Sequence, residues 1–193
     1  LLRQNPNIMM IGEIRDAETA ATAIEASLTG HLVLSTIHTN SAAGAVPRFV
    51  GLGVEPQILA NSLECSIGQR LVRKLCPNCK QETELDPATA KEVAKIIDGI
   101  NAEAKTGLPK KIQFYKAVGC DKCGGIGYKG RLGIYEVISN SSEMQKLIQQ
   151  PDITNNEIEE QAIKDGAVLM LQDGILKAAA GETSVDEVFR VAK

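Results

Sequence analysis

The amino-acid sequence predicts an α/β protein that carries a four-cysteine module and ends in a small all-helical domain. Three observations lead to this fold class. Short apolar runs alternate with helical patterns over residues 1–73. Two Cys-x-x-Cys pairs lie within residues 74–133, and helix-capping patterns recur within residues 134–193. These three ranges are the predicted domains.

A strand–helix–strand unit opens the first range. Ile8–Ile11 is a continuous apolar run, which is typical of a strand buried on both faces. Asp16 can cap a helix that continues to Leu28, and Gly30 can end it. A second apolar run covers His31–Ser35. Because a helix is the usual crossover between parallel strands, the two strands are expected to be parallel.

The remaining elements are indicated by periodicity and by turn residues. Helices are expected at Ser41–Val50 and Glu55–Glu64, with glycines between them. Gln69–Arg73 and Leu132–Ile138 read as strands, and Asp86-Pro87 predicts a helix start. Capping-box spacing predicts three more helix starts, at Asn140 with Glu143, Thr154 with Glu157, and Ser184 with Glu187.

The composition is that of an ordinary globular protein, with 44% hydrophobic and 23% charged residues among 193. The net charge of -3 gives no reason to expect nucleic acid as a partner. No apolar run approaches the roughly 20 residues that span a bilayer, so we expect no direct membrane insertion. The chain starts at Leu1 without a signal peptide and runs at once into a strand pattern, as if cut inside a domain.

Four of the five cysteines form two pairs that bracket 40 residues: Cys76 with Cys79, and Cys120 with Cys123. Each pair can form a tight turn that presents two thiolates, and two such turns complete a tetrahedral shell. An all-thiolate shell without a redox partner favours a structural zinc ion and leaves no open position for catalysis. Nearby glycines can expose amide N–H groups to the sulfur atoms, namely Gly124, Gly125 and Gly127.

Unligated thiols or disulfides are the alternative for these cysteines. Without a secretory segment, paired cysteines in a reducing compartment favour metal binding instead. Cys65 stands alone in an apolar stretch and is expected to be a small core residue.

An acidic turn follows the first predicted strand. Glu13 lies just past the carboxyl end of that strand, where open α/β sheets bind their ligands. A carboxylate there can hold a water of a magnesium shell or polarise an attacking water. A solvated turn beside a helix cap is the alternative, and Arg15 and Asp16 could pair to fix the turn.

The two histidines flank the second predicted strand. His38 follows its carboxyl end, on the same rim as Glu13 if the strands are parallel. His31 begins the strand, toward the opposite rim, and is expected to be structural. Small polar residues that can meet phosphate oxygens surround His38, namely Ser35, Thr36, Thr39 and Asn40.

Together these motifs resemble a known family. Met10–Asp16 is similar to the Walker B segment of the type II secretion and type IV pilus assembly ATPases, and Thr29–Asn40 is similar to their histidine-rich motif. Gln69–Arg73, leading into Cys76-Pro77-Asn78-Cys79, resembles the entry into their tetracysteine module, and Gly130–Glu136 resembles the return from it. The resemblance covers essentially the whole chain. The cysteine module indicates the secretion or pilus-extension branch rather than the retraction ATPases.

The resemblance implies a RecA-like P-loop NTPase core, of which residues 1–73 are the C-terminal part, in a homo-hexameric cytoplasmic ATPase. ATP hydrolysis with Mg²⁺ would drive pilus or pseudopilus assembly through an inner-membrane platform and cytoplasmic adaptor proteins. The ATPase would then associate with the inner membrane through these partners. Carried over by motif, Glu13 is the Walker B acid near magnesium, His38 contacts the terminal phosphate, and His31 belongs to the same nucleotide-binding motif.

One motif of that family is missing. The sequence contains no Gly-x-x-x-x-Gly-Lys-Ser/Thr loop, which supplies most of the grip on a triphosphate. The resemblance places this loop, an acidic segment and arginine fingers upstream. We therefore expect this chain alone neither to bind ATP tightly nor to hydrolyse it. A zinc-stabilised adaptor without nucleotide hydrolysis is the alternative function.

Charge is distributed unevenly along the chain. Between residues 105 and 131 a single acid, Asp121, stands against seven bases: Lys105, Lys110, Lys111, Lys116, Lys122, Lys129 and Arg131. From residue 141 to residue 193, ten acids stand against five bases. Two solvated faces are the simplest interpretation. The alternative is that the basic module docks on an acidic surface of a neighbouring subunit or of the platform.

Overall fold

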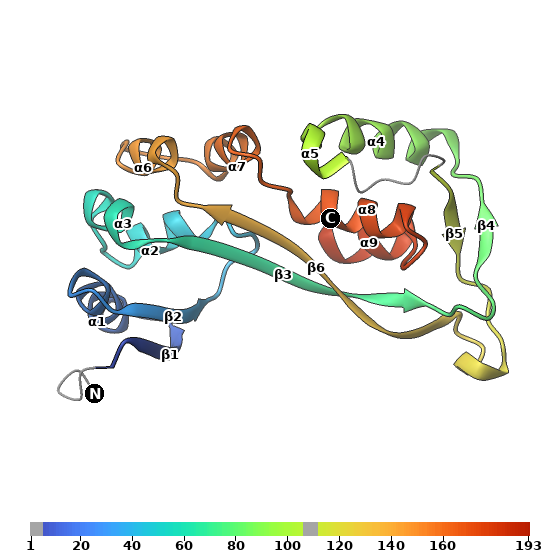
Figure 1. Ribbon diagram of the computed structural model, residues 1–193, viewed down its shortest axis with the longest axis horizontal. Coiled ribbons are helices and arrows are strands. Elements are labelled where there is room, and N and C mark those ends of the chain that lie inside the picture. Colours follow the sequence, from blue (N-terminus) through green and yellow to red (C-terminus); the bar gives the residue numbers. More distant parts are fainter. Residues whose placement is uncertain (1–5, 106–111) are drawn as a thin grey trace. The chain divides into compact units, whose positions relative to one another are not determined.

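A computed structural model describes residues 6–105 and 112–193 (Figure 1). The chain divides into two compact units. Unit 1 combines the described residues up to Ser66 with Ile138–Asp165, and unit 2 combines Ile67–Val137 with Gly166–Lys193. The chain passes between the units within two long strands and once more after residue 165.

Unit 1 begins with two parallel strands, β1 (Ile8–Ile14) and β2 (Leu32–Ile37), which are joined by helix α1 (Ala17–Leu28). The Asp16 side chain caps α1, accepting the N–H of Thr19 at 2.8 Å. The predicted parallel strand–helix–strand unit is therefore confirmed (Figure 1).

The sheet of unit 1 is covered on one face only within the described residues. Helix α1 packs on both strands and buries its alanines, namely Ala20, Ala23 and Ala26. On the other face Ile8 pairs with Leu32 and Met10 pairs with Leu34, and all four side chains are exposed. The expectation that β1 is buried on both faces is not met here. A strand pair this apolar needs a second covering layer, which the described part of unit 1 does not supply.

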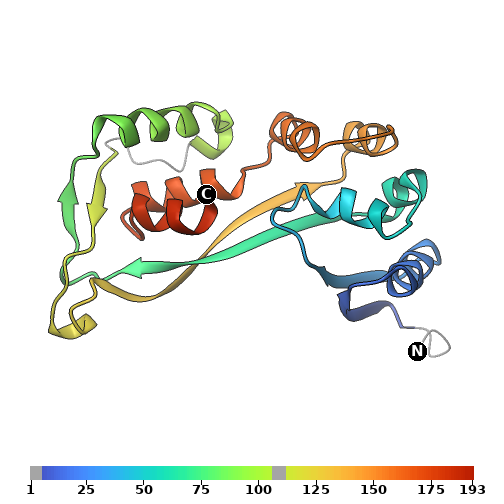
Figure 2. The same ribbon diagram turned by 180° about the vertical axis from the view of Figure 1, so that it is seen from behind.

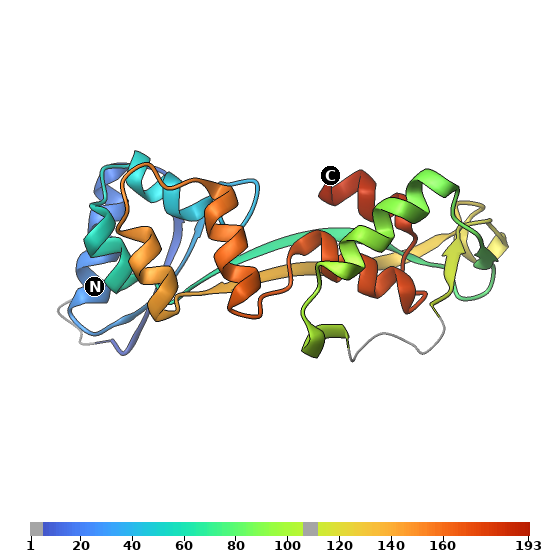
Figure 3. The same cartoon turned by 90° about the horizontal axis from the view of Figure 1, so that it is seen from above.

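Within the described residues, unit 1 contains four further helices: α2 (Ala45–Gly51), α3 (Pro56–Ser62), α6 (Ser142–Ile148) and α7 (Asn155–Lys164). Helix α3 packs against α1 and α6, and α6 packs against α7 (Figure 3). Helix α2 begins four residues later than expected, because the Ser41 hydroxyl accepts the N–H of Gly44 and forms a turn there. The buried apolar side chains of these helices include Val46, Leu59, Met144, Ile148 and Ile158.

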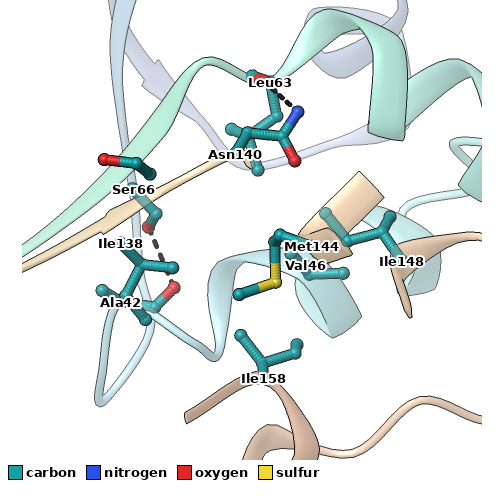
Figure 4. Close-up of a pocket in the computed structure, with 10 residues that line it drawn as sticks. Ala42, Val46, Leu63, Ser66, Ile138, Asn140, Met144, Ile148 and Ile158 are labelled. Carbon is teal, nitrogen blue, oxygen red and sulfur yellow. Dashed lines mark hydrogen bonds between the residues drawn. The ribbon is translucent and has the colours of Figure 1, made fainter. Parts of the chain in front are cut away.

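The predicted cap at Asn140 is wrong by one residue. The hydroxyl of Ser141 caps α6 instead, accepting the N–H of Met144 at 3.0 Å. The Asn140 amide donates to the carbonyl of Ala60 in α3 at 2.7 Å. It also donates to the carbonyl of Leu63, at the end of α3, at 2.5 Å (Figure 4). Asn140 therefore caps the C-terminal end of α3, and Ser141 caps the N-terminal end of α6.

Unit 2 contains most of a long two-stranded sheet, formed by β3 (Cys65–Leu75) and β6 (Tyr128–Ser139). Two short strands, β4 (Gln81–Thr83) and β5 (Phe114–Lys116), form a separate antiparallel pair (Figure 2). Three-residue strands are too short to produce a readable alternation in the sequence, so this pair was not predicted. One face of the long sheet buries a small cluster of Val72, Ile134 and Met170.

The helices of unit 2 are α4 (Pro87–Asp98), α5 (Ala102–Lys105), a 3₁₀ turn at Asp121–Cys123, α8 (Met170–Ala179) and α9 (Val185–Ala192). Helix α8 packs against α9 and against α4 (Figures 1 and 3). Their shared core consists of Val93, Ile175, Ala178, Val185 and Val188. Among the helices that the structure describes, none combines the length and the apolar character needed to cross a bilayer.

The compact units group the chain differently from the predicted domain ranges. The helices after residue 140 are divided, because α6 and α7 belong to unit 1 while α8 and α9 belong to unit 2. Capping patterns locate helix starts but carry no information about which core a helix packs on. The ranges 1–73, 74–133 and 134–193 therefore remain a prediction about motif content and domains.

Two capping boxes were predicted in these helices besides the one at Asn140. Thr154 and Glu157 form the reciprocal bonds at the start of α7, as expected. Ser184 caps α9 by accepting the N–H of Glu187 at 3.2 Å. The carboxylate of Glu187, however, turns away from the helix start and is only 1% exposed.

Two arginines hold this buried carboxylate. Arg73 donates to Glu187 from its backbone N–H at 2.9 Å and from its guanidinium at 2.6 Å, and Arg190 donates two more bonds at 2.8 and 2.6 Å. Burial by itself would raise the pKa of Glu187, but the bonds from Arg190 and Arg73 outweigh burial and lower this pKa to about 2. The cluster ties α9 to strand β3 inside unit 2.

Replacing Glu187 by Gln is expected to destabilise the protein by about 3 kcal/mol at pH 7. The folded state lowers the pKa of the Glu187 carboxyl from 4.5 to about 2 because it favours the charged carboxylate, and Gln cannot carry this charge. This contribution is complete above about pH 5 and is lost as pH falls through the folded pKa. The gap between parent and variant should therefore close between pH 5 and pH 2 in urea unfolding. Asp186→Asn, an exposed change on the same helix, should cost less than about 1 kcal/mol. A pH-independent gap would contradict this assignment.

Candidate functional site

The carboxyl ends of β1 and β2 bring an acid and a histidine together. Glu13 is the second-last residue of β1, and His38 directly follows β2. One carboxylate oxygen of Glu13 contacts Nε2 of His38, and the other contacts Nε of Arg15. The prediction that Glu13 and His38 share one rim of a parallel sheet is confirmed by the strand pairing and by this contact.

The expected pairing of Arg15 with Asp16 is wrong. Arg15 turns to Glu13, while Asp16 is engaged as the N-cap of α1. The backbone and side-chain hydrogen bonds from Thr19 lower the pKa of the Asp16 carboxyl. Arg15 therefore belongs to the site around Glu13, and Asp16 belongs to the start of α1.

The small hydroxyls near His38 bond to backbone carbonyls. Thr36 Oγ1 donates to the carbonyl of Gly12 at 2.8 Å, which ties the end of β2 to β1. Thr39 Oγ1 donates to the carbonyl of Ser41 at 2.9 Å. The His38 side chain remains 80% exposed, so the pair with Glu13 is open to a ligand arriving from solvent.

His31 lies at the opposite end of β2. Its Nδ1 is 3.0 Å from the carbonyl of Ala26 and 3.0 Å from the hydroxyl of Thr29, so the ring closes the C-terminal end of α1. The six residues of β2 span about 20 Å, which separates His31 from the Glu13–His38 pair. This position fits the structural role expected for His31, and its part in the nucleotide-binding motif stays a prediction.

The four paired cysteines converge on one point. Their sulfur atoms all lie within 4.8 Å of one another. The Sγ atoms of Cys76 and Cys120 are 3.9 Å apart, those of Cys79 and Cys123 are 3.8 Å apart, and those of Cys120 and Cys123 are 3.7 Å apart. A tetrahedral zinc ion with bonds of about 2.3 Å places its sulfur ligands about 3.8 Å apart. All five cysteines are free thiols, and the spacing of the four sulfur atoms would permit a tetrahedral metal ion.

Backbone groups support this shell. The N–H groups of Cys120 and Gly127 donate to Cys123 Sγ at 3.2 and 3.3 Å. Gly127 has a positive φ of 75°, which favours glycine. A Cβ added at this position would lie only 2.6 Å from the Cβ of Ala117, so no larger residue fits. The expectation that glycines expose N–H groups to sulfur is confirmed at Gly127.

A polar contact that the sequence did not predict joins the two cysteine turns. Lys122 Nζ lies 3.2 Å from Asn78 Oδ1, and Asn78 Nδ2 lies 3.9 Å from Cys76 Sγ. Because 44 residues separate Asn78 from Lys122, no local spacing could have indicated this pair.

The pKa values of two of these thiols are shifted in opposite directions. Burial raises the pKa of Cys79 to about 12. Burial also opposes ionisation of Cys123, but the N–H groups of Cys120 and Gly127 outweigh it and lower the pKa of Cys123 to about 6. Binding of a metal to all four sulfur atoms therefore has to displace protons, which makes affinity fall with falling pH.

Cys65 corrects one expectation. It is exposed at the start of β3 and is not a core residue, because the apolar stretch around it forms a strand whose alternate residues face solvent.

Ion pairs partly offset the charge asymmetry on its acidic side. Several acids after residue 140 are matched within their own unit: Glu143 by Lys146, Asp173 by Lys177, Glu182 by Lys74, and Glu187 by two arginines. On the basic side, Lys116, Lys129 and Arg131 are exposed, while Lys110 and Lys111 fall outside the described residues. Among these partners Arg73 and Lys74 lie outside residues 141–193, so the excess of acids in that range is reduced but not removed.

A small cavity in unit 1 is apolar and separate from both sites (Figure 4). The Asn140 side chain borders it, and its Oδ1 atom is buried without a protein partner. The lining residues are Ala42, Val46, Leu63, Ser66, Ile138, Ser139, Asn140, Met144, Ile148 and Ile158. Two serines and Asn140 are its polar lining residues, and none of the lining residues is titratable.

The fold and the sites define an α/β protein with an acid–histidine pair at the strand ends and a tetracysteine centre of metal-shell geometry. The chain belongs to the type II/IV secretion system protein family, whose model matches residues 1–190. It is 43% identical over 193 residues to the type II secretion system ATPase E of Vibrio cholerae. It is 47% identical over 192 residues to the type IV pilus assembly ATPase PilB of Pseudomonas aeruginosa. These alignments cover 100% of this chain but only 36% and 32% of the two relatives.

Solved structures show the same fold. The ATPase DotB of Legionella pneumophila matches with a TM-score of 0.61 at 21% identity, over 98% of this chain and 39% of that chain. The ATPase DotB of Yersinia pseudotuberculosis matches with a TM-score of 0.62 at 16% identity, over 98% of this chain and 37% of that chain. At these identities the similarity concerns the fold alone.

Proposed function

We propose that this chain is part of a cytoplasmic ATPase that couples ATP hydrolysis to the assembly of a pilus or of a type II secretion pseudopilus. The observation that carries the proposal is the contact between Glu13 and His38 at the carboxyl ends of two parallel strands. Relatives that align with the whole chain are named for ATPases of these two systems. The proposal concerns the full-length protein, because the chain spans only about a third of the length of these relatives.

In this proposal Glu13 is the Walker B acid. Its carboxylate would hold a water of the magnesium shell or polarise the attacking water, and His38 would contact the terminal phosphate. ATP and Mg²⁺ supply the phosphoryl group and the positive charge that neutralises it. His31 holds the end of α1 at the far end of β2, and its part in the nucleotide-binding motif stays a prediction.

The described residues hold half of such a site. The chain lacks a Gly-x-x-x-x-Gly-Lys-Ser/Thr loop, so the triphosphate needs a grip from elsewhere in the full-length protein. The exposed apolar face formed by Ile8, Met10, Leu32 and Leu34 supports a RecA-like core completed by a further layer. The chain alone is accordingly proposed to be inactive.

Zinc is the proposed ion of the tetracysteine centre. The spacing of the sulfur atoms and the N–H donors to Cys123 fit a closed tetrahedral shell held by Cys76, Cys79, Cys120 and Cys123. Such a shell stabilises the fold and leaves no open position for a substrate. The role proposed for zinc is therefore structural.

The proposed partners follow from the family. The full-length protein would form a homo-hexamer and act on an inner-membrane platform and cytoplasmic adaptor proteins, and it would reach the membrane only through them. Nucleic acid is not a proposed partner, because the chain carries a net charge of -3.

ATP turnover by the full-length protein, measured beside this chain alone, tests the function. Turnover by the full-length protein and none by the chain is the expected result, since only the former can hold the triphosphate. No turnover by the full-length protein, even with its platform partner present, would favour the zinc-stabilised adaptor.

A further inference from the structure

The connection between α8 and α9, residues 181–184, is bound along its whole length to the base of the cysteine module. The Gly181 carbonyl accepts Lys80 Nζ at 2.7 Å, and the Glu182 carbonyl accepts the N–H of Leu75 at 2.8 Å. The side chains continue the pattern, with Thr183 Oγ1 donating to the Arg73 carbonyl at 2.8 Å and Ser184 Oγ lying 2.8 Å from the Tyr128 hydroxyl. Every residue of the connection thus has a partner in the segments that carry the cysteines.

Two of these partners are direct sequence neighbours of the cysteines, and a third follows a residue that bonds to one of them. Leu75 precedes Cys76, and Lys80 follows Cys79. Tyr128 follows Gly127, whose N–H donates to Cys123 Sγ and whose carbonyl accepts the N–H of Cys76 at 2.9 Å. The positions of the bonded groups are therefore fixed by the same two turns that position the sulfur atoms.

Because the hydroxyl groups of the connection are buried, losing these hydrogen bonds would destabilise the protein. Thr183 is fully buried and Ser184 is 3% exposed. A buried hydroxyl that loses its partner costs more than a surface one, because water cannot replace the bond. A Cβ at Gly181 would lie 2.9 Å from Lys80 Nζ and 3.0 Å from the ring of Tyr115, so the connection also fits closely. The same turn leads into Glu187, which Arg73 holds from strand β3.

We propose that metal binding by the four cysteines and seating of the α8–α9 helix pair form one cooperative event. The cysteine module then clamps the C-terminal helices of its own chain and is not an independent appendage. The inference rests on the proposed zinc site, and it predicts that the metal acts on α9 through the connection. Loss of the metal frees the turns, the turns release residues 181–184, and α9 loses its attachment to β3.

Amide hydrogen exchange in the full-length protein tests the coupling directly. After zinc is removed with EDTA, exchange over Val185–Ala192 is expected to accelerate at least about tenfold, while α1 in unit 1 stays unchanged. Zinc content is measured on the same samples. A protein that never holds zinc overturns both the zinc site and the coupling. A protein that loses zinc while α9 keeps its protection overturns the coupling alone.

A variant that spares every cysteine provides the reverse test. Combining Lys80→Met with Tyr128→Phe removes two bonds to the connection and should speed zinc release to EDTA about tenfold, because coupling is reciprocal. The matched control is Lys129→Met with Tyr135→Phe, two exposed positions on β6 away from the connection, which should release zinc at the parental rate. Equal release by the two double variants would overturn the proposal even though both proteins fold.

Discussion

Replacing Glu13 by Gln in the full-length protein is expected to lower ATP turnover at least tenfold, a barrier increase of about 1.4 kcal/mol. Gln keeps the size of the side chain but removes the charge that a magnesium-bound or attacking water requires. It also weakens the contacts with His38 and Arg15, so these two side chains are no longer held in place at the rim of the sheet. Steady-state phosphate release is the measurement.

His38→Ala is expected to lower turnover by a similar factor, because the imidazole is the partner of Glu13 and faces the open side of the site. Glu25→Gln is the matched control, since Glu25 is an exposed acid of α1 away from the rim. It should leave turnover unchanged. Variants at Glu13 and His38 that match the control would refute the assignment of this rim to catalysis.

Replacing Cys76 by Ser is expected to abolish stoichiometric zinc binding and to lower the melting temperature by at least about 10 °C. Zinc binding by a structural four-ligand site contributes many kcal/mol to folding, and one lost thiolate removes much of it. Cys76 is fully buried directly after β3, so replacing it also changes the packing inside unit 2. Zinc per chain by elemental analysis and thermal unfolding give the two readouts.

Cys65→Ser is the control for this prediction. Cys65 is an exposed free thiol at the start of β3, and it takes no part in the cluster. This variant should keep one zinc per chain and the parental melting temperature. Parent protein purified without zinc, or equal behaviour of the two serine variants, would exclude the structural zinc ion.

Local sequence patterns predicted the elements that depend on local physics. The strand–helix–strand unit follows from two apolar runs with Asp16 and Gly30 between them, and the structure shows the parallel pair. The cysteine spacing likewise predicted the converging thiols. Placing Glu13 and His38 on one rim required only the parallel direction of the strands. In the strand–helix–strand unit a short stretch of sequence contains the physical cause, whereas the thiols were predicted from two repeated Cys-x-x-Cys pairs with 40 residues between them.

Features that depend on distant residues were not predictable in this way. The carboxylate of Glu187 has the spacing of a capping box with Ser184, yet it is taken by Arg73, which lies 114 residues earlier. The choice between Asn140 and Ser141 as a cap was decided by the carbonyls of α3. Which helices join which unit was equally hidden, because that choice depends on cores assembled from separate parts of the chain.

The most direct test of the acid–histidine pair combines both of its changes in one protein. ATP turnover is measured for the full-length protein carrying Glu13→Gln and His38→Ala together, beside the two single variants. If the residues act as one unit, the double variant loses no more than about the larger single loss. Losses that multiply would mean that Glu13 and His38 act independently, and full activity of the double variant would mean that the ATPase site lies elsewhere.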